Sequence, residues 1–327
     1  MPQMRRRTFA RHSTIVAYNR GARDGALLAH YRLHRLQAAT CQRPGYPASL
    51  EGTPRRSREG PLKSLIAIPT YNERDNIVTL IDDVLAVAPT TDILIIDDNS
   101  PDGTGQVVDE IAARNPQVHA LHRPGKMGLG TAYVRGFQYA IEQGYDLVFE
   151  MDADFSHDPK YLPSFFEAAK DADLVIGSRY IAGGGVPNWK PIRRFISGGG
   201  NIFARVVLGI PIHDCTGGYR CFRVAALRTL NLDAINAQGY AFQVELAYNF
   251  WKSGYRVREV PIIFLDRRVG KSKMSRKIFV EAFLWVVRAR FTGDAEVRRP
   301  QLPDGSSTTV GAGTAGRPEG ATTRNTR

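Results

Sequence analysis

Short apolar runs alternate along residues 64–180 with stretches in which apolar residues recur every three or four positions. Apolar runs that end at polar residues are typical of strands buried on both faces, and the longer spacing is typical of helices. The pattern predicts strands at 64–72, 92–100, 118–122, 146–154 and 173–180, and helices at 76–87, 104–114, 130–143 and 162–169. This alternation predicts an α/β fold, with a mostly parallel central sheet flanked by helices.

The two ends of the chain follow a different pattern. Residues 1–61 are rich in Arg, Ala, Pro and Ser, and residues 294–327 are rich in Gly, Thr, Ser and Pro, so both segments are predicted to be disordered. We expect one domain over residues 62–293. Near its end, residues 276–291 predict an amphipathic helix, which either lies on a membrane surface or docks on the core of the domain.

The charge is unevenly distributed. The chain of 327 residues has a formal net charge of +12, but residues 1–63 hold 13 Lys and Arg against 3 Asp and Glu, whereas residues 64–293 hold 26 against 25. A nucleic-acid-binding domain would itself be basic, so we expect no nucleic-acid partner. The basic leader is either a disordered extension or an arm that contacts anionic lipid headgroups. Three cysteines exclude a disulfide scaffold, and no apolar run reaches the ~18 residues that span a bilayer.

Several predicted strands end in acidic residues, and ligands of open α/β sheets bind beyond the carboxyl ends of the strands. Asp97 and Asp98 follow the second strand, where they either cap the next turn or accept hydrogen bonds from a nucleoside. Asp152 and Asp154 point to the same side of the fourth strand, and Mg²⁺ or Mn²⁺ would relieve the repulsion between two such carboxylates. His157 has no second His or Cys at zinc-ligand spacing, so it is interpreted as a polar loop residue.

Basic residues follow the fifth predicted strand. Arg179 ends that strand, and Arg193 and Ser197 come soon afterwards. A helix that begins near Arg193 would present this arginine and Ser197 on one face, and a cation beside a hydroxyl suits a phosphate monoester. The alternative is an ordinary solvated face, which nearby glycines and Trp189, expected to be exposed, make less attractive.

A basic loop that contains a glycine precedes the last predicted helix. Residues 265–275 include Arg267 and Lys273 on either side of Gly270. A loop of this composition, late in an α/β domain, is suited to close over a diphosphate, and a solvated lysine loop has the same composition. Both interpretations stay open on the residues alone.

Taken together, the motifs of residues 64–275 resemble those of the dolichol-phosphate and polyprenol-phosphate mannose synthases of glycosyltransferase family 2. This resemblance covers about two-thirds of the chain, and the order and spacing of its segments are highly specific. The matching segments are IPTYNERDNI, IIDDNSPDGT, GKMGLGTAYVRGF, MDADFSHDP, GSRYIAGG, DCTGGYRCF, GYAFQVE and DRRVGKSKMS.

The resemblance implies a GT-A fold and inverting transfer of mannose from GDP-mannose to a polyprenyl phosphate, the activity of a dolichyl-phosphate β-D-mannosyltransferase. It implies a donor site in which one group of residues contacts the guanosine, another meets the ribose, the metal and the diphosphate, and a third holds the phosphates. These are Pro69, Tyr71, Glu73, Ile96 and Asp98 for the nucleoside, Asp152, Ala153 and Asp154 for the ribose, metal and diphosphate, and Arg179, Arg267 and Lys273 for the phosphates.

The resemblance also assigns the remaining roles. Asp154 is the expected protein ligand of Mg²⁺ or Mn²⁺, and Ser156 stands where some relatives have Gln, so a water molecule is expected as a further ligand. Arg193 and Ser197 match the pair that holds the acceptor phosphate. Asp152 is the carboxylate expected nearest to the developing positive charge on mannose. Since the acceptor is already an anion, no protein base is required.

Partners follow from the same resemblance. Some relatives carry C-terminal transmembrane helices, and this chain resembles the catalytic subunits that work beside a separate membrane protein. We therefore expect a peripheral protein at the cytoplasmic face of a membrane surface. Two alternatives keep an α/β sheet with acidic strand ends: a polyprenyl-phosphate glucosyltransferase that uses UDP-glucose, and a metal-dependent nucleotidyltransferase, although the glycine-rich N-terminal signature of the latter is missing.

Overall fold

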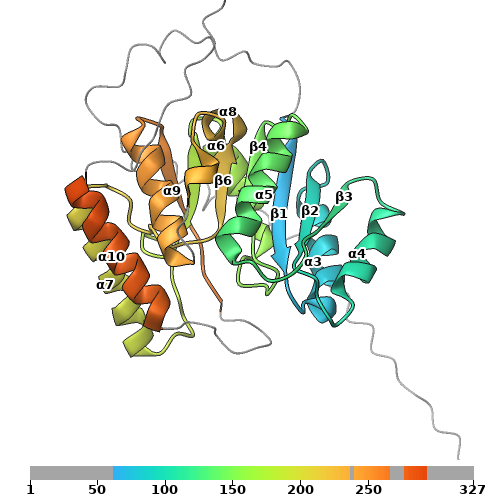
Figure 1. Ribbon diagram of the computed structural model, residues 1–327, viewed down its shortest axis with the longest axis horizontal. Coiled ribbons are helices and arrows are strands. Elements are labelled where there is room, and N and C mark those ends of the chain that lie inside the picture. The colour runs from blue at the N-terminus through green and yellow to red at the C-terminus, as the bar shows by residue number, and fades with distance from the viewer. Residues whose placement is uncertain (1–61, 236–238, 266–275, 293–327) are drawn as a thin grey trace, which may run out of the picture.

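A single seven-stranded sheet forms the centre of the molecule (Figure 1). The computed structural model describes residues 62–235, 239–265 and 276–292. The strands lie in the order β3-β2-β1-β4-β6-β5-β7. Their bounds are β1 Ser64–Thr70, β2 Asp92–Asp97, β3 Val118–His122, β4 Leu147–Glu150, β5 Leu174–Ser178, β6 Arg220–Arg223 and β7 Val257–Pro261.

The sheet is mostly parallel, as the sequence predicts. β1 pairs in parallel with β2 and β4, β2 pairs in parallel with β3, and β5 pairs in parallel with β7. β6 is antiparallel to both β4 and β5 and lies between them. Strands β4 and β5 therefore run in the same direction as β1 and β2, which brings the carboxyl ends of all four to one edge of the sheet.

Helices cover both faces of the sheet. The four helices predicted within residues 64–180 are confirmed within a few residues, and further helices follow β5, as Figure 1 shows. Their bounds are α3 Arg74–Val87, α4 Thr104–Ala112, α5 Leu129–Glu142, α6 Leu162–Ala169, α7 Pro191–Leu208, α8 Val224–Leu227, α9 Tyr240–Lys252 and α10 Arg276–Thr292, with 3₁₀ turns η2 Pro159–Tyr161 and η3 Leu232–Ala234.

Two hydrophobic clusters fill the spaces between the helices and the sheet. Successive residues of a strand point to opposite faces, so Leu65 of β1 joins the cluster beneath α5 and α9, whereas Ile66 joins the cluster beneath α3 and α6. Both side chains are fully buried. Helix α5 comes very close to the sheet at Gly136, where an added Cβ would lie 3.0 Å from Ala67 Cβ and 3.1 Å from Ile96 Cδ1. Burial on both faces explains why these strands are continuous apolar runs.

The last described helix, α10, packs against α7 and α9 at one end of the molecule (Figure 1). Val286 and Ala289 of α10 are buried in the core, and Phe283 stacks on Phe203 of α7 with 4.8 Å between ring centroids. The helix also exposes apolar side chains, including Phe291 at 84% exposure. The alternative in which this helix docks on the core of the domain is confirmed, and its contact with a membrane surface stays a prediction.

Other predictions about the chain ends remain predictions. The expected leader, residues 1–61, and the expected tail, residues 294–327, lie outside the described residues. None of the helices that the structure describes is long and apolar enough to cross a membrane.

Candidate active site

The loop that follows β4 carries the two carboxylates that the sequence singled out. Asp154 is 6% exposed, and its Oδ1 accepts a hydrogen bond from the backbone N–H of Ser156 at 3.1 Å. Between them, Phe155 has a φ of 61°, a left-handed conformation that is costly for an aromatic residue. Strained backbone of this kind persists where the surrounding structure requires it, and it is concentrated at functional sites.

Asp152 is held from two sides. The hydroxyl of Tyr133, on α5, donates to Asp152 Oδ1 at 3.0 Å, and the backbone N–H of Asp152 donates to Nδ1 of His157 at 2.9 Å. Burial and the nearby Asp152 charge raise the pKa of Tyr133 well above its usual value, so its hydroxyl stays protonated and donates. The side chain of Asp152 is 30% exposed, which leaves part of the carboxylate open to a ligand.

His157 lies in the loop after β4, as interpreted, and its side chain is buried there. It is 2% exposed and stacks on Tyr219 with 4.9 Å between ring centroids. Burial lowers the pKa of His157, so the imidazole is neutral at pH 7. Since Nδ1 accepts from the Asp152 backbone, the proton is on Nε2, which lies 3.9 Å from Asp152 Oδ2. His157 thus supports the loop that carries Asp152 and Asp154, which we call the acidic loop.

A buried polar group lies directly under this loop. Glu150, the last residue of β4, is fully buried opposite Arg220 of β6, and Gln243 of α9 donates to Glu150 Oε2 at 3.0 Å. Burial raises the pKa of Glu150 to about 8. Arg220 donates instead to the backbone carbonyls of Gly217, Gln243 and Cys215 at 2.8 Å each. These contacts tie β4, β6 and α9 together beneath the acidic loop.

The ends of β1 and β2 form the second part of the site. Asp97 accepts hydrogen bonds from Thr70 and Ser100, so it has the capping role that the sequence left open. Asp98 is 7% exposed and forms a bidentate ion pair with Arg123, with distances of 2.6 and 2.9 Å. Arg123 is not among the predicted site residues. Its ion pair supplies the compensating charge that a buried carboxylate requires.

The residues expected to contact a nucleoside occupy different environments. Pro69 and Tyr71 are partly exposed at the end of β1, and Lys126 lies over the Tyr71 ring, 4.4 Å from its centroid. Glu73 is partly exposed at the start of α3 and accepts from the side chain of Asn76 at 2.8 Å. Ile96 is fully buried beneath α5, so it packs in the core and does not face the edge.

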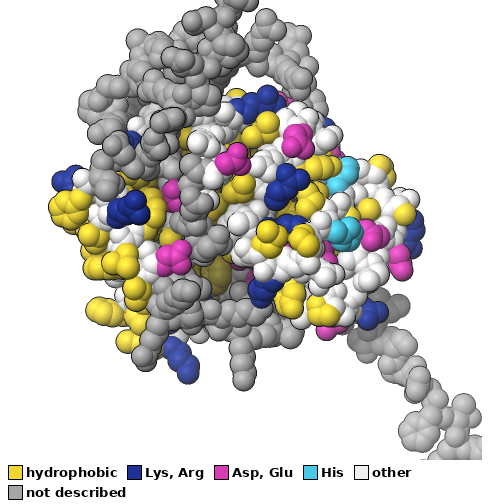
Figure 2. Space-filling model, viewed as in Figure 1, with side chains coloured by type: hydrophobic (Ala, Val, Ile, Leu, Met, Phe, Trp, Pro, Cys, Tyr) yellow, Lys and Arg dark blue, Asp and Glu magenta, His cyan; other side chains and the backbone are white. Residues whose placement is uncertain are grey.

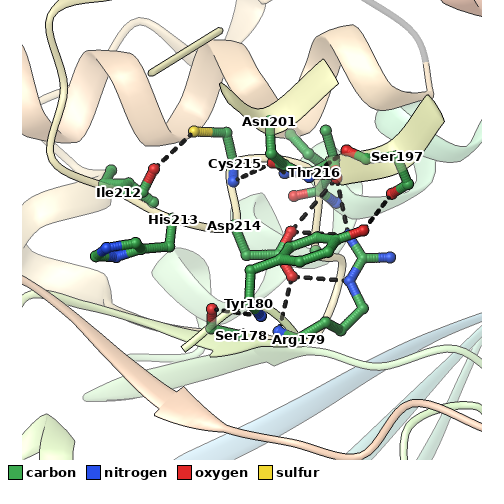
Figure 3. Close-up of polar contacts among 12 residues, drawn as sticks. Ser178, Arg179, Tyr180, Ser197, Asn201, Ile212, His213, Asp214, Cys215 and Thr216 are labelled. Carbon is green, nitrogen blue, oxygen red and sulfur yellow. Dashed lines mark hydrogen bonds and ion pairs between the residues drawn. The ribbon is translucent and has the colours of Figure 1, made fainter. Parts of the chain in front are cut away.

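Arg179 forms the third part of the site, at the end of β5 (Figure 3). Its Nε and Nη2 donate to the two carboxylate oxygens of Asp214 at 2.7 Å each, and Nη2 also donates to Thr216 Oγ1 at 2.8 Å. Asp214 is fully buried, and Arg179 is 7% exposed. Burial raises the pKa of Asp214, but the charge and hydrogen bonds of Arg179 outweigh this effect and lower the pKa below its usual value.

Aromatic rings connect Arg179, at the end of β5, to the acidic loop. The guanidinium carbon of Arg179 lies 5.6 Å from the ring centroid of Phe264, and His157 contacts the same ring with 5.9 Å between centroids. Trp189 contacts Phe264 as well, with 5.7 Å between centroids. The expectation that Trp189 is exposed is wrong: it is 6% exposed, because Phe264 and Arg193, whose guanidinium carbon is 3.9 Å from the Trp189 ring, cover it.

Arg193 and Ser197 lie on α7, as predicted, one turn apart. The helix begins at Pro191, which suits the first helical position, and ends at Leu208, which is followed by Gly209 with a left-handed φ of 66°. The Tyr180 hydroxyl donates to Ser197 Oγ at 2.7 Å. Ser197 also borders a cavity of about 270 Å³. The other residues that line this cavity are Trp189, Ile196, Gly199, Gly200, Phe203, Ala204, Thr216, Tyr240, Val244, Ala282, Phe283 and Val286.

Two of the predicted site residues cannot be placed. Arg267 and Lys273 lie outside the described residues, so their roles stay predictions. The structure adds Tyr133, Tyr180 and Asp214 to the site. Segments that contain these residues were singled out in the sequence, but no pattern within them shows which strand end each residue contacts, because every partner is distant in the chain.

The donor set at the acidic loop fits a divalent cation. Asp152 and Asp154 supply carboxylate oxygens, and the buried Ser156 Oγ has no hydrogen-bond partner among the described residues. Within the described part of the chain, no three His, Cys, Asp or Glu side chains converge to form a closed metal site. Mg²⁺ needs no such cage, because it usually binds through one or two carboxylates together with water and substrate phosphates.

An α/β sheet with acidic and basic residues at the carboxyl ends of its strands is the arrangement of a protein that binds a nucleotide or a similar anionic ligand. Residues 65–230 match the family model described as glycosyl transferase family 2. The chain belongs to this family.

Two curated relatives are similar over most of their length. The chain is 45% identical to an undecaprenyl-phosphate mannosyltransferase of Micrococcus luteus over 236 residues, which are 71% of this chain and 97% of the relative. It is 44% identical to a polyprenol monophosphomannose synthase of Mycolicibacterium smegmatis over 234 residues, 70% of this chain and 88% of the relative.

A solved structure shares the fold. Glucosyl-3-phosphoglycerate synthase of Mycobacterium tuberculosis, in complex with Mn²⁺, UDP and glucosyl-3-phosphoglycerate, has a TM-score of 0.50 and 17% sequence identity. The similarity covers 76% of this chain and 85% of that protein. The expected GT-A type of α/β fold is thereby confirmed.

Proposed function

We propose that this protein transfers mannose from GDP-mannose to a polyprenyl phosphate with inversion, which yields polyprenyl-phosphate mannose and GDP. The observation that carries the proposal is the position of Ser197. It lies one turn from Arg193 and borders an apolar cavity, while contacts through Phe264 connect this region to the acidic loop. An anionic headgroup with an apolar chain matches such a surface, and both curated relatives are named for polyprenyl-phosphate mannose synthesis.

The donor would bind along the ends of β1, β2 and β4. Pro69, Tyr71 and Glu73 are partly exposed there and would contact the nucleoside. Asp154, with Asp152, would hold Mg²⁺ or Mn²⁺, which neutralises charge on the departing diphosphate when it is bound. The strained backbone at Phe155 and the contacts of Tyr133 and His157 fix the direction of both carboxylates before the donor arrives.

The acceptor would bind along α7. Arg193 would provide a cation and Ser197 a hydroxyl to the acceptor phosphate, and the first isoprene units would enter the cavity between α7, α9 and α10. The acceptor phosphate is an anion at neutral pH, so it attacks without a protein base. The acceptor residues thus act by orientation, which is worth several kcal/mol when two reactants are held in line.

Charge balance explains the remaining assignments. As the bond between mannose and GDP breaks, positive charge develops on the sugar and negative charge on the diphosphate. Asp152, with its carboxylate 30% exposed, is the candidate that offsets the sugar charge. Arg267 and Lys273, both outside the described residues, would hold the diphosphate together with the metal.

The apolar edge formed by α7 and α10 supports binding at a membrane surface (Figure 2). Its exposed apolar side chains are Ile192, Phe195, Ile196, Ile202 and Val206 on α7 and Val280, Phe283, Leu284 and Phe291 on α10. Soluble monomers rarely expose contiguous apolar patches of this kind, and such patches mark membrane or protein interaction sites. We propose peripheral attachment at the cytoplasmic face through this edge, beside a separate membrane protein.

One assay tests the proposed reaction. Purified protein is incubated with radiolabelled GDP-mannose, Mg²⁺ or Mn²⁺ and a polyprenyl phosphate in detergent, and the lipid product is tested for release of mannose by mild acid. We expect a labile, β-linked mannosyl lipid, with GDP as a stronger competitor than UDP. Glucose transfer from UDP-glucose without mannose transfer, or release of inorganic diphosphate in place of GDP, would contradict the proposal.

A further inference from the structure

Tyr180 connects the end of β5 to helix α7, which carries Ser197. It follows Arg179 directly, and its hydroxyl donates a hydrogen bond to Ser197 Oγ at 2.7 Å (Figure 3). A serine hydroxyl has one proton and two lone pairs. Because Ser197 accepts from Tyr180, its own proton remains available for a second acceptor. Tyr180 therefore determines in which sense Ser197 forms hydrogen bonds.

The backbone at Ser197 is held independently of Tyr180. The side-chain amide of Asn201, which is 2% exposed, donates to the Ser197 carbonyl and to Thr216 Oγ1 at 3.0 Å each. Its Oδ1 accepts from the backbone N–H of Cys215 at 2.8 Å. These contacts fix the rotation of α7 against the loop at 214–216. Removal of the Tyr180 hydroxyl should consequently leave the helix in place and free only the serine side chain.

The ring of Tyr180 is also fixed. The guanidinium carbon of Arg179 lies 5.4 Å from its centroid, and Arg179 is itself clamped by Asp214. A cation near an aromatic face stabilises the ring where it lies. The Tyr180 hydroxyl is thus held in a fixed position beside Ser197. A donor that is already fixed loses little conformational entropy when a ligand binds.

We propose that Tyr180 is a positioning residue for the acceptor phosphate, an inference that rests on the proposed function. In the complex, the Tyr180 hydroxyl donates a hydrogen bond to Ser197 Oγ, and the Ser197 hydroxyl donates a hydrogen bond to a phosphate oxygen. Successive hydrogen bonds of this kind polarise and strengthen one another. Ser197 is then a stronger and better directed donor than an isolated serine would be.

A double-mutant cycle tests the coupling. Tyr180→Phe, Ser197→Ala and the double variant are compared with the wild-type protein, with farnesyl phosphate as acceptor and GDP-mannose as donor. A net hydrogen bond is worth a factor of about three to ten in affinity. We expect Tyr180→Phe to lower kcat/KM for farnesyl phosphate by this factor, mainly through KM, with the KM for GDP-mannose unchanged. In the Ser197→Ala background the same substitution should cause no further loss.

Tyr145→Phe provides the matched control, because the Tyr145 hydroxyl donates to Asp92 Oδ2 at 2.6 Å near the opposite edge of the sheet. It should leave the KM for farnesyl phosphate unchanged. Losses that multiply in the double variant, or an equal rise in the KM for GDP-mannose, would overturn the role of Tyr180. If the wild-type protein transfers no mannose, the proposed function fails separately. The cycle is then measured as farnesyl phosphate binding by calorimetry, where multiplying losses again overturn the proposal.

Discussion

Three consecutive glycines in the middle of α7 offer a test in which stability and activity should change in opposite directions. Gly199 and Gly200 line the apolar cavity, and an added Cβ at either position would meet no atom within 4 Å. Gly198 lies in the same helix but does not line the cavity, and its Cβ would make only an ordinary contact of 3.9 Å with Tyr180. A helix gains nothing from three glycines, so we interpret two of them as room for the acceptor chain.

The expected magnitudes follow from helix propensity and from packing. Each glycine in a helix interior costs about 0.5–1 kcal/mol relative to alanine, so Gly199→Ala/Gly200→Ala should raise the free energy of unfolding by about 1–2 kcal/mol. In a domain of this size, each kcal/mol raises Tm by about 2–4 °C. Two added methyl groups also reduce the cavity of about 270 Å³. Overfilling that costs the acceptor about 1 kcal/mol weakens its binding about fivefold.

Thermal unfolding and acceptor kinetics measure the two effects in the same preparations. We expect the double variant to melt at a higher temperature and to have a raised KM for a polyprenyl phosphate, with an unchanged KM for GDP-mannose. Gly198→Ala should gain stability without the kinetic penalty. A stabilised Gly199→Ala/Gly200→Ala variant with wild-type acceptor kinetics would refute the interpretation of the cavity.

Further predictions concern the ion pair, the metal, the acceptor and the leader. Asp214→Ala leaves Arg179 buried without its counter-charge, so it should lower the free energy of unfolding by about 3–5 kcal/mol in urea denaturation. Because the pKa of Asp214 is lowered, its stabilisation is present above about pH 3.8 and should vanish as the pH falls through the native pKa, so the two proteins should converge in acid. Asp154→Ala should abolish metal-dependent transfer with an unchanged circular dichroism spectrum; full activity with EDTA present would contradict the metal assignment. Arg193→Ala should raise the KM for the acceptor more than that for GDP-mannose, and the reverse result would exclude its acceptor role. Deletion of residues 1–60 should preserve transfer to a short detergent-soluble acceptor, which an inactive but folded truncation would contradict.

The sequence predicts the strands up to residue 180 well, but it does not predict the later strands β6 and β7. Strands such as β1 and β2 are buried on both faces, so they are uninterrupted apolar runs that periodicity detects. β6, with the sequence RCFR, contains two arginines and is only four residues long. It is a strand because it pairs with β4 and β5 on either side, and Arg220 satisfies its charge through three backbone carbonyls. Such long-range pairing leaves no local periodic signal.

The site shows the same division between local and long-range information. The spacing of Arg193 and Ser197 is a local pattern, and the structure places both residues on one helix, as expected. The acidic pair Asp152 and Asp154 is also a local pattern, but β4 ends at Glu150, so the pair lies in the following loop and not in the strand predicted at 146–154. The burial of His157 is not local, because the rings that cover it come from distant segments. A polar residue in a predicted loop is usually assigned to the surface, and only its partners show that it supports the site.

The ion pair with Asp214 changes how Arg179 can contact a sugar-nucleotide donor. The sequence resemblance gives it a phosphate or sugar contact, yet Asp214, fully buried, already balances its charge. A neutralised arginine attracts an incoming diphosphate weakly, and Nη1 is the guanidinium nitrogen that forms no hydrogen bond with the described residues. Arg179 would thus orient a donor through a single N–H direction, and the net positive charge opposite the diphosphate would have to come from the metal and from Arg267 and Lys273. Substitution of Lys273 by alanine should therefore weaken GDP binding more at low than at high ionic strength, because an uncompensated charge is screened by salt, whereas Arg179→Lys should show no such dependence.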